Sequence, residues 1–249
     1  MATGATLFIS ALLTGGRLAA QQRPTLDVGE RLEYDVKFGA IHVGTGAMEV
    51  REMADVRGRA TWHTTFAIRG GVPFFHVNDR MESWIDTATF SVLRAVQDNH
   101  ERGRHRTRTI ELYPERRVYV DARQPDVEEP SVDQPLDEGA FLFFLRTIPL
   151  EVGRRYDFDR YLKPDRNPVT LEVVRRERIT VPAGTFETIV VRPMIKTKGI
   201  FSEDGHAEVW LTDDACHLVV QMKAKLSFGS INLYLRHYAP GAVIAEGGR

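Results

Sequence analysis

Apolar and polar residues alternate from Leu218 to Phe228, which is the clearest periodic pattern in this chain. Leucine, valine, methionine, alanine and phenylalanine occupy every second position, and most positions between them hold glutamine, lysine or serine. Successive side chains of a β-strand point to opposite faces, so one face of this segment requires apolar surroundings while the other meets water. At ~3.3 Å per residue, the segment extends over about 36 Å. The pattern therefore predicts a long strand in a half-buried sheet.

Comparable alternation recurs along the chain and predicts a sheet of about ten strands. The further segments are Arg31–Phe38, Ile41–Arg51, Ala60–Arg69, Phe74–Asp79, Phe90–Asp98, Thr107–Tyr113, Val169–Ile179, Thr185–Pro193, His206–Thr212 and Ser230–Tyr238. Short turns at residues 38–41, 181–185 and 228–231 make consecutive strands antiparallel neighbours. A sheet of this size must curl or close to protect its edges. We expect a mainly β protein, with a large curled antiparallel sheet or an open β-barrel built from meander hairpins.

One segment has helical periodicity instead. Asp137 can cap a helix that ends before Pro149, and its apolar face carries Phe141, Leu142, Phe144, Leu145 and Ile148. We expect this helix to pack on the concave face of the sheet or to plug its mouth. The acidic segment 121–137 contains three prolines and predicts an irregular loop. Strand patterns resume after Pro149, so residues 21–240 are interpreted as a single domain, followed by a polar tail at 241–249.

The first twenty residues have the pattern of an export signal. An apolar run from Ala5 to Leu13 precedes small residues that end near Ala20, which predicts a signal peptide over residues 1–20 and a periplasmic protein. No later stretch reaches the ~18 apolar residues of a membrane helix, so no transmembrane segment is expected in the mature chain. The single cysteine, Cys216, excludes an intrachain disulfide and a cysteine-based zinc site. A formal net charge of -1 argues against nucleic acid as a partner.

Several motifs in this order resemble a bacterial family, the domain of unknown function 3108. They are Gly29-Glu30-Arg31-Leu32-Glu33-Tyr34-Asp35-Val36, Asp79-Arg80-Met81-Glu82-Ser83-Trp84-Ile85-Asp86, Val181-Pro182-Ala183-Gly184-Thr185-Phe186-Glu187-Thr188, Trp210-Leu211-Thr212-Asp213-Asp214 and Phe228-Gly229-Ser230-Ile231. The resemblance implies export but no known activity. By analogy of fold, a curled sheet with a helix in its concavity is similar to the carriers that move lipoproteins across the periplasm.

Two groups of residues are candidates for ligand binding. Four arginines alternate along one predicted strand and would share a face: Arg102, Arg104, Arg106 and Arg108. Their guanidinium groups could hold the phosphate or carboxylate of a lipid head group or an acidic glycan, or they form a solvated outer face beside carboxylates. The second group is apolar and either lines a cavity or belongs to the core: Phe66, Phe74, Phe75, Phe141, Phe144 and Leu145.

The remaining polar motifs favour structural roles. His100 and His105, near Asp98, could ligate a metal ion across a hairpin, but their spacing is not specific to any metal site. The group of His76, Asp79 and Glu82 matches no zinc signature, and the pair Asp213 and Asp214 is typical of a turn. No serine-nucleophile, phosphate-loop or dinucleotide-binding motif occurs. No metal or other cofactor is predicted.

The sequence leaves several functions open. The first is a non-catalytic periplasmic protein that binds a hydrophobic or amphipathic, lipid-like ligand or a small anion within the curled sheet. The second is a structural or interaction module of the cell envelope with a protein partner. The third is a glycan or lipid hydrolase, which requires His, Asp or Glu side chains to converge in a cleft. A transmembrane β-barrel is disfavoured by charges on both faces of several strands.

Overall fold

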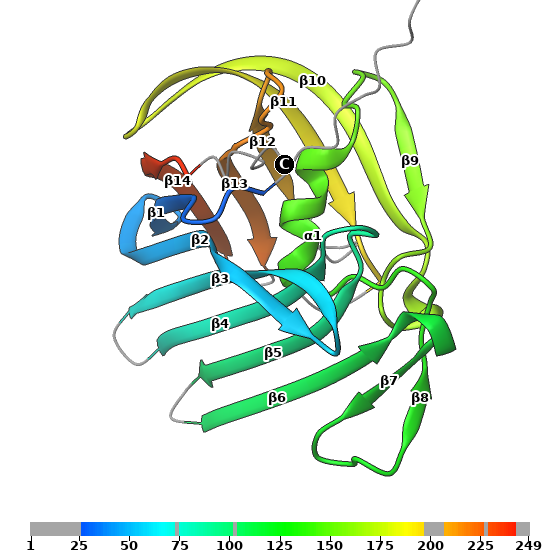
Figure 1. Ribbon diagram of the computed structural model, residues 1–249. Helices are drawn as coiled ribbons and strands as arrows, with labels where there is room; N and C mark the ends of the chain where they lie inside the picture. Colours follow the sequence, from blue (N-terminus) through cyan, green and yellow to red (C-terminus); the bar gives the residue numbers. More distant parts are fainter. Residues whose placement is uncertain (1–25, 73–74, 102–103, 197–206, 227–228, 243–249) are drawn as a thin grey trace, which may run out of the picture.

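The computed structural model describes residues 26–72, 75–101, 104–196, 207–226 and 229–242. Within this part of the chain, 14 strands form one antiparallel sheet that curls around a short helix (Figure 1). The strands are β1 Arg31–Phe38, β2 Ile41–Val56, β3 Arg59–Val72, β4 Phe75–Asp86, β5 Val92–Glu101, β6 Arg104–Tyr113, β7 Val118–Asp121, β8 Glu128–Pro130, β9 Arg155–Phe158, β10 Val169–Val181, β11 Gly184–Met194, β12 Glu208–Thr212, β13 Val219–Leu226 and β14 Gly229–Ala239. The prediction of a mainly β fold with a large antiparallel sheet is confirmed.

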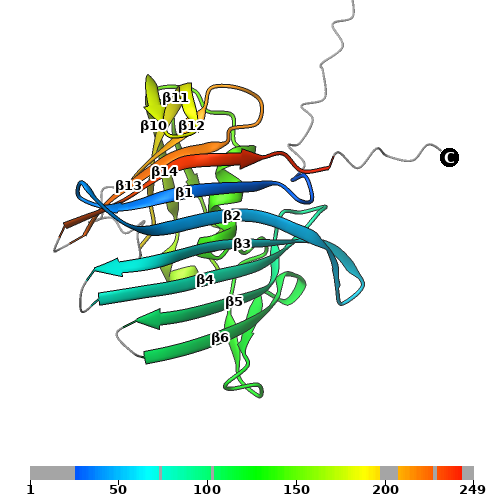
Figure 2. The ribbon, with the colours of Figure 1, turned by 90° about the vertical axis from the view of Figure 1, so that its left-hand side faces the viewer.

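The strand order is that of a meander with one long closure. It runs β8-β7-β6-β5-β4-β3-β2-β1-β14-β13-β12-β11-β10-β9, so β1 pairs with β14 although they lie at opposite ends of the chain. Figure 2 shows these two strands side by side in the middle of the sheet. The edges are β8 and β9, and the connection between them carries the helix. The sheet is therefore open at the point where the chain leaves it to form the helix.

Helix α1 covers Glu138–Phe144 and continues into a 3₁₀ turn at Leu145–Thr147. Asp137 caps it as predicted, because its carboxylate accepts a hydrogen bond from the backbone of Ala140 at 3.0 Å. Gly139 faces β4, and a Cβ there would lie 3.1 Å from the Cβ of Met81. The small residue thus allows the helix to approach the strand closely, on the concave side of the sheet (Figure 1).

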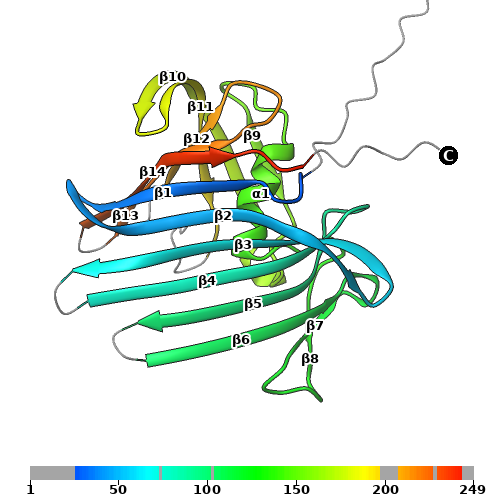
Figure 3. The same ribbon diagram turned by 60° about the vertical axis from the view of Figure 1, so that its left-hand side comes forward.

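The core lies between α1 and the inner face of the sheet. Its largest fully buried side chains include Tyr34, Phe143, Leu32, Met48 and Ile85. The hydroxyl of Tyr34 donates a hydrogen bond to the carbonyl of Val219 at 2.9 Å, so its polar end is satisfied in the interior. In Figure 3 strands β3 to β6 extend past α1 toward their hairpin connections, and the helix covers only part of their inner face.

Three short strands were missed by the sequence prediction. The segment 121–137, predicted to be an irregular loop, contains β8, and the neighbouring strands β7 and β9 were not predicted. These strands have only three or four residues, too few for an alternating pattern to be detected. β7 and β9 form because the longer neighbours β6 and β10 supply hydrogen-bond partners, and β8 in turn pairs with β7. The predicted signal peptide and the residues Phe228 and Phe74 lie outside the described residues.

The described residues hold no helix of the length and apolarity that a membrane span requires.

Candidate functional site

A cavity of about 320 Å³ lies on the inner side of β4, β5 and β6, beside the start of α1. Its apolar wall consists of Met81, Ala95, Ile110 and Leu162. Its polar wall consists of Gln97, Asn99, Arg108, Asp137, Glu138, Tyr161, Lys163 and Arg166. The site therefore combines an apolar surface with both signs of charge.

Strand register explains why these side chains meet. Met81 on β4 pairs with Gln97 on β5, and Gln97 pairs with Arg108 on β6. Side chains of directly paired residues share one face of a sheet. Because Met81 faces the helix, Gln97 and Arg108 face the helix as well. The same rule places Asn99 and its partner Arg106 on this inner face.

Two members of the arginine row, Arg106 and Arg108, are thus directed inward. Arg108 lines the cavity, and its Nε donates to Asp121 on β7 at 2.7 Å. Arg106 is exposed and does not line the cavity. The backbone of Arg104 belongs to β6 and its side chain is not described, while Arg102 lies outside the described residues. Of the two candidates whose side chains the structure describes, Arg108 lines the cavity and Arg106 does not.

Two acidic side chains at the start of α1, Asp137 and Glu138, line the same cavity as Arg108. Ser83 on β4 donates a hydrogen bond to Asp137 at 2.8 Å, and Tyr161 donates one to Glu138 at 3.3 Å. Burial raises the pKa of both carboxyls, and the charge of Asp137 raises the pKa of Glu138 further. Burial also raises the pKa of the Tyr161 hydroxyl. Burial therefore disfavours the charged forms of these acids, which line the same cavity as the cations Arg108, Lys163 and Arg166.

The predicted apolar residues whose side chains the structure describes do not line this cavity. Phe66, Phe141, Phe144 and Leu145 are buried in the core, with side chains almost fully excluded from water. The ring of Phe144 packs against that of Phe158 with centroids 5.2 Å apart. Their role in the structure is to hold α1 against the sheet. Phe74 lies outside the described residues, and the side chain of Phe75 is not described.

Sequence reasoning missed most of the cavity's polar wall. Gln97 could have been found, because it lies two positions after Ala95 on the predicted strand Phe90–Asp98, whereas Asn99 lies just beyond the end of that prediction. Tyr161, Lys163 and Arg166 could not, because they lie in the non-periodic connection between β9 and β10. That connection reaches the cavity through a bridge between Leu136 and Tyr161.

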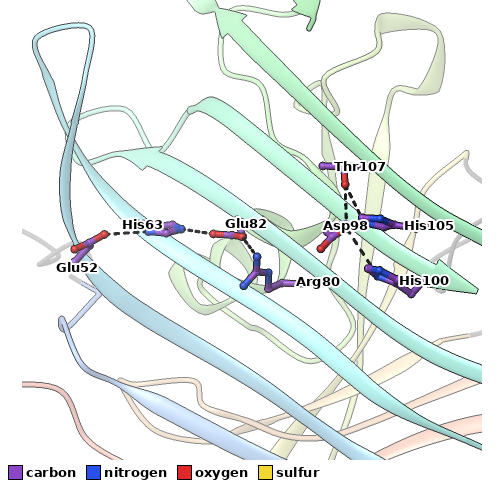
Figure 4. A network of polar contacts seen from close by, with 8 residues as sticks. All are labelled: Glu52, His63, Arg80, Glu82, Asp98, His100, His105 and Thr107. Atoms are coloured by element: carbon purple, nitrogen blue, oxygen red, sulfur yellow. Dashed lines mark hydrogen bonds and ion pairs between the residues drawn. The ribbon is translucent and has the colours of Figure 1, made fainter. Parts of the chain in front are cut away.

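The outer face of strands β2 to β6 carries two polar clusters, shown in Figure 4. In the first, the Nε2 atom of His63 lies 2.8 Å from Glu82, and its Nδ1 atom lies 3.4 Å from Glu52. The imidazole stacks on Trp84 with ring centroids 4.2 Å apart, and Arg80 contacts Glu82 at 2.9 Å. The histidine is thus held between carboxylates and an indole ring.

The second cluster lies at the β5–β6 hairpin (Figure 4). The Nε2 atom of His105 lies 2.5 Å from Asp98 Oδ1, and the His100 ring stacks on the His105 ring at 3.7 Å. Thr107 donates to the same Asp98 oxygen at 3.1 Å. The hydrogen bond from His105 lowers the pKa of Asp98, which favours the ionised carboxylate.

The other polar motifs take part in local structure. Asp214 accepts hydrogen bonds from the backbones of Cys216 and His217, and Asp213 pairs with Arg176 at 2.7 Å. Asp79 accepts a hydrogen bond from the backbone of His100. The side chain of His76 is not described.

Comparison with known proteins gives a family and a fold. The family described as protein of unknown function DUF3108 matches residues 33–236. The structure of a β-barrel-like protein with domain of unknown function DUF1849, from Brucella abortus, superposes with a TM-score of 0.54. That alignment has 12% sequence identity and covers 88% of this chain and 100% of the other.

A protein from Bacteroides fragilis with a YmcC-like fold, provisionally described as exported, gives a TM-score of 0.32 at 12% identity. The alignment covers 86% of this chain and 97% of the other. No protein with a curated function matches the sequence. The likeness to the Brucella protein supports the fold alone.

Proposed function

The chain belongs to the DUF3108 family of proteins of unknown function, and we propose from its own site that the protein is a non-catalytic binder of amphipathic ligands with an anionic head group. The export pattern of the first twenty residues supports a place in the periplasm. The ligand would occupy the inner cavity between α1 and strands β4 to β6.

The observation that carries this proposal is the composition of the cavity. Its volume of about 320 Å³ is at the lower end of the range for small-molecule sites. Met81, Ala95 and Ile110 offer an apolar surface for a hydrocarbon chain. Lys163 and Arg166 stand at the same cavity and suit a carboxylate or phosphate.

The surroundings of the acids support binding rather than catalysis. Asp137 is committed to the helix cap and to Ser83, and Glu138 accepts a hydrogen bond from Tyr161. The serine and cysteine side chains in the described ranges do not line the cavity. A general acid or base needs free access to a reacting group, whereas these carboxyls already have protein partners.

A pair of variants on one strand tests the proposal. Gln97→Trp places an indole in the cavity, whereas Val96→Trp places one at the adjacent position on the outer face. A fluorescent fatty acid would be titrated into the parent protein and both variants. We expect Gln97→Trp to weaken binding at least tenfold and Val96→Trp to leave it unchanged. Equal affinities in all three proteins would overturn the proposal and favour an interaction module.

The natural ligand can be identified separately. Native mass spectrometry of the protein recovered from its own cells, followed by lipid extraction, would reveal a co-purified anionic amphiphile. Cell fractionation of the same material tests the periplasmic location. A bound lipid that is absent from Gln97→Trp would name the ligand class.

A further inference from the structure

Three side chains that can each ligate a metal ion meet on the outer face of strands β5 and β6. Asp98 and His100 are two positions apart on β5, so they share a face of the strand. His105 on β6 pairs directly with His100, and Thr107 pairs with Asp98. The register therefore places two imidazoles, a carboxylate and a hydroxyl at the corners of one small patch (Figure 4).

The distances suit one small cation. One ligand atom from each of Asp98, His100 and His105 lies within 4.8 Å of the other two. The Nδ1 atom of His100 is 3.9 Å from Asp98 Oδ1, and the Nε2 atom of His105 is 2.5 Å from it. A tetrahedral ion with bonds of about 2.0–2.2 Å to N and O requires ligand separations of roughly 3.3 Å. Shifts of about an ångström would therefore bring all three atoms into coordination range.

An unsatisfied atom gives a second, independent indication. The Nδ1 atom of His100 is buried and has no hydrogen-bond partner among the described residues. A buried polar atom without a partner is unusual in a folded protein, and an ion is one of the groups that can satisfy it. The Nδ1 atom of His100 lies 3.9 Å from Asp98 Oδ1, a distance too long for a hydrogen bond.

The imidazole rings of His100 and His105 are stacked face to face. Their centroids are 3.7 Å apart and their planes differ by 14°. The lone pairs lie in the ring planes, so the rings must tilt apart to reach one ion. The side chains of His100 and His105 are 42% and 55% exposed, which leaves room for this rotation.

We propose that Asp98, His100 and His105 form a binding site for a divalent transition-metal ion of the zinc class, with water completing its coordination. Two imidazole nitrogens select such an ion over calcium or magnesium, which prefer oxygen ligands. Thr107 positions the site, because its hydroxyl contacts both Asp98 and His105 at 3.1 Å. The site lies on the opposite face of the sheet from the inner cavity and does not depend on it.

Metal titration of the full-length, tag-free protein tests the site. After treatment with a chelator, Zn²⁺ would be titrated calorimetrically into the parent and into His100→Ala, His105→Ala and Asp98→Asn. Co²⁺ would be used in parallel, because its visible absorption reports the coordination geometry. We expect one ion per chain, with affinity at least about tenfold weaker in each variant. The matched control is His42→Ala, which removes a histidine 3.5 Å from Asp35 in a pair that has no third ligand in the described structure.

Each outcome of the titration is decisive when the variants remain folded, as checked by circular dichroism without metal. Loss of binding in the three site variants with retention in His42→Ala supports the site. Unchanged affinity in His105→Ala, or equal loss in His42→Ala, overturns it. Histidine ring NMR of the parent supplies a second readout, since Zn²⁺ must shift the signals of His100 and His105 before those of other histidines.

Discussion

The guanidinium of Arg146 binds both carboxylate oxygens of Glu30 in the protein interior, where the two side chains are 6% and 4% exposed. The Nη2 to Oε2 distance is 2.9 Å, and Arg146 Nε also donates to the carbonyl of Cys216 at 3.1 Å. Arg146 follows α1, whereas Glu30 immediately precedes β1. The pair therefore fastens the end of the helix to two segments that are distant in the sequence.

Removing one partner of this pair is expected to destabilise the fold strongly. Glu30→Ala leaves the Arg146 cation buried without its counter-charge, and we expect a loss of about 3–5 kcal/mol in the free energy of unfolding. Urea denaturation measures this loss. Glu33→Ala is the control, because its partner Arg31 is substantially exposed, and it should cost less than about 1 kcal/mol. Similar losses in the two variants would contradict the role assigned to the buried pair.

The helix cap gives a prediction that separates hydrogen bonding from charge. Asp137→Ala removes the acceptor for the Ala140 backbone and should cost about 1 kcal/mol. Asp137→Asn keeps an acceptor oxygen and removes the charge that burial disfavours, so it should be more stable than Asp137→Ala at neutral pH. Thermal unfolding of both variants checks this order. Equal melting temperatures would show that the cap contributes nothing measurable.

Glu138 predicts a specific dependence of stability on pH. Burial raises the pKa of Glu138 in the folded state above the ordinary value of 4.5. At pH values between these two pKa values, the folded chain binds the proton more tightly than the unfolded chain. The contribution of Glu138 to stability is present below about pH 4.5 and decreases as the pH rises through the folded pKa. Glu138→Gln cannot ionise, so its stability relative to the parent should increase over the same range. Urea denaturation at several pH values between about 4 and 8 measures the difference.

The exposed Glu115→Gln is the control for this experiment. If the stability of Glu115→Gln relative to the parent changes with pH as that of Glu138→Gln does, burial of Glu138 at the cavity is not the cause of the change.

Two facing glycines set a limit on the spacing of β2 and β3. Gly44 pairs with Gly70, and a Cβ at Gly44 would lie 2.6 Å from the Cα of Gly70. Backbone atoms cannot move aside as a flexible side chain can, so Gly44→Ala or Gly70→Ala should cost about 1–3 kcal/mol. Gly46→Ala is the comparison, since its Cβ would lie 3.3 Å from the side chain of Leu233. Chemical denaturation of the three variants should show a smaller loss for Gly46→Ala.

Much of the fold was predictable because it depends on local patterns. The alternation after Leu218 predicted β13, and Asp137 followed by apolar residues predicted the cap and start of α1. β4 was predicted to stop at Asp79 but continues to Asp86, because the polar residues Asp79 and Ser83 share the inner face with Met81 and interrupt the apolar pattern. The short strands β7, β8 and β9 escaped prediction, because a neighbouring backbone rather than their own sequence specifies them.

The candidate site was predictable only in part. Alternation places Arg106 and Arg108 on one face of β6, but periodicity does not state whether that face is inside or outside. The pairing of Arg108 with Gln97, and of Gln97 with Met81, decides that it is the inner face. Phe141 and Phe144 show the same limit of periodicity. An apolar helix face can either line a cavity or fill a core, and here it fills the core.

The strand-rich class, the antiparallel turns, the helix and its cap are all specified by residues that are close together in the chain. The meeting of distant groups depends on the packed fold: β1 with β14, Glu30 with Arg146, and Tyr161 with Glu138. The physical reason is that strand register and helix docking are selected by packing over the whole sheet. A local pattern specifies that a face is apolar or charged, whereas only the packed fold specifies what lies opposite it.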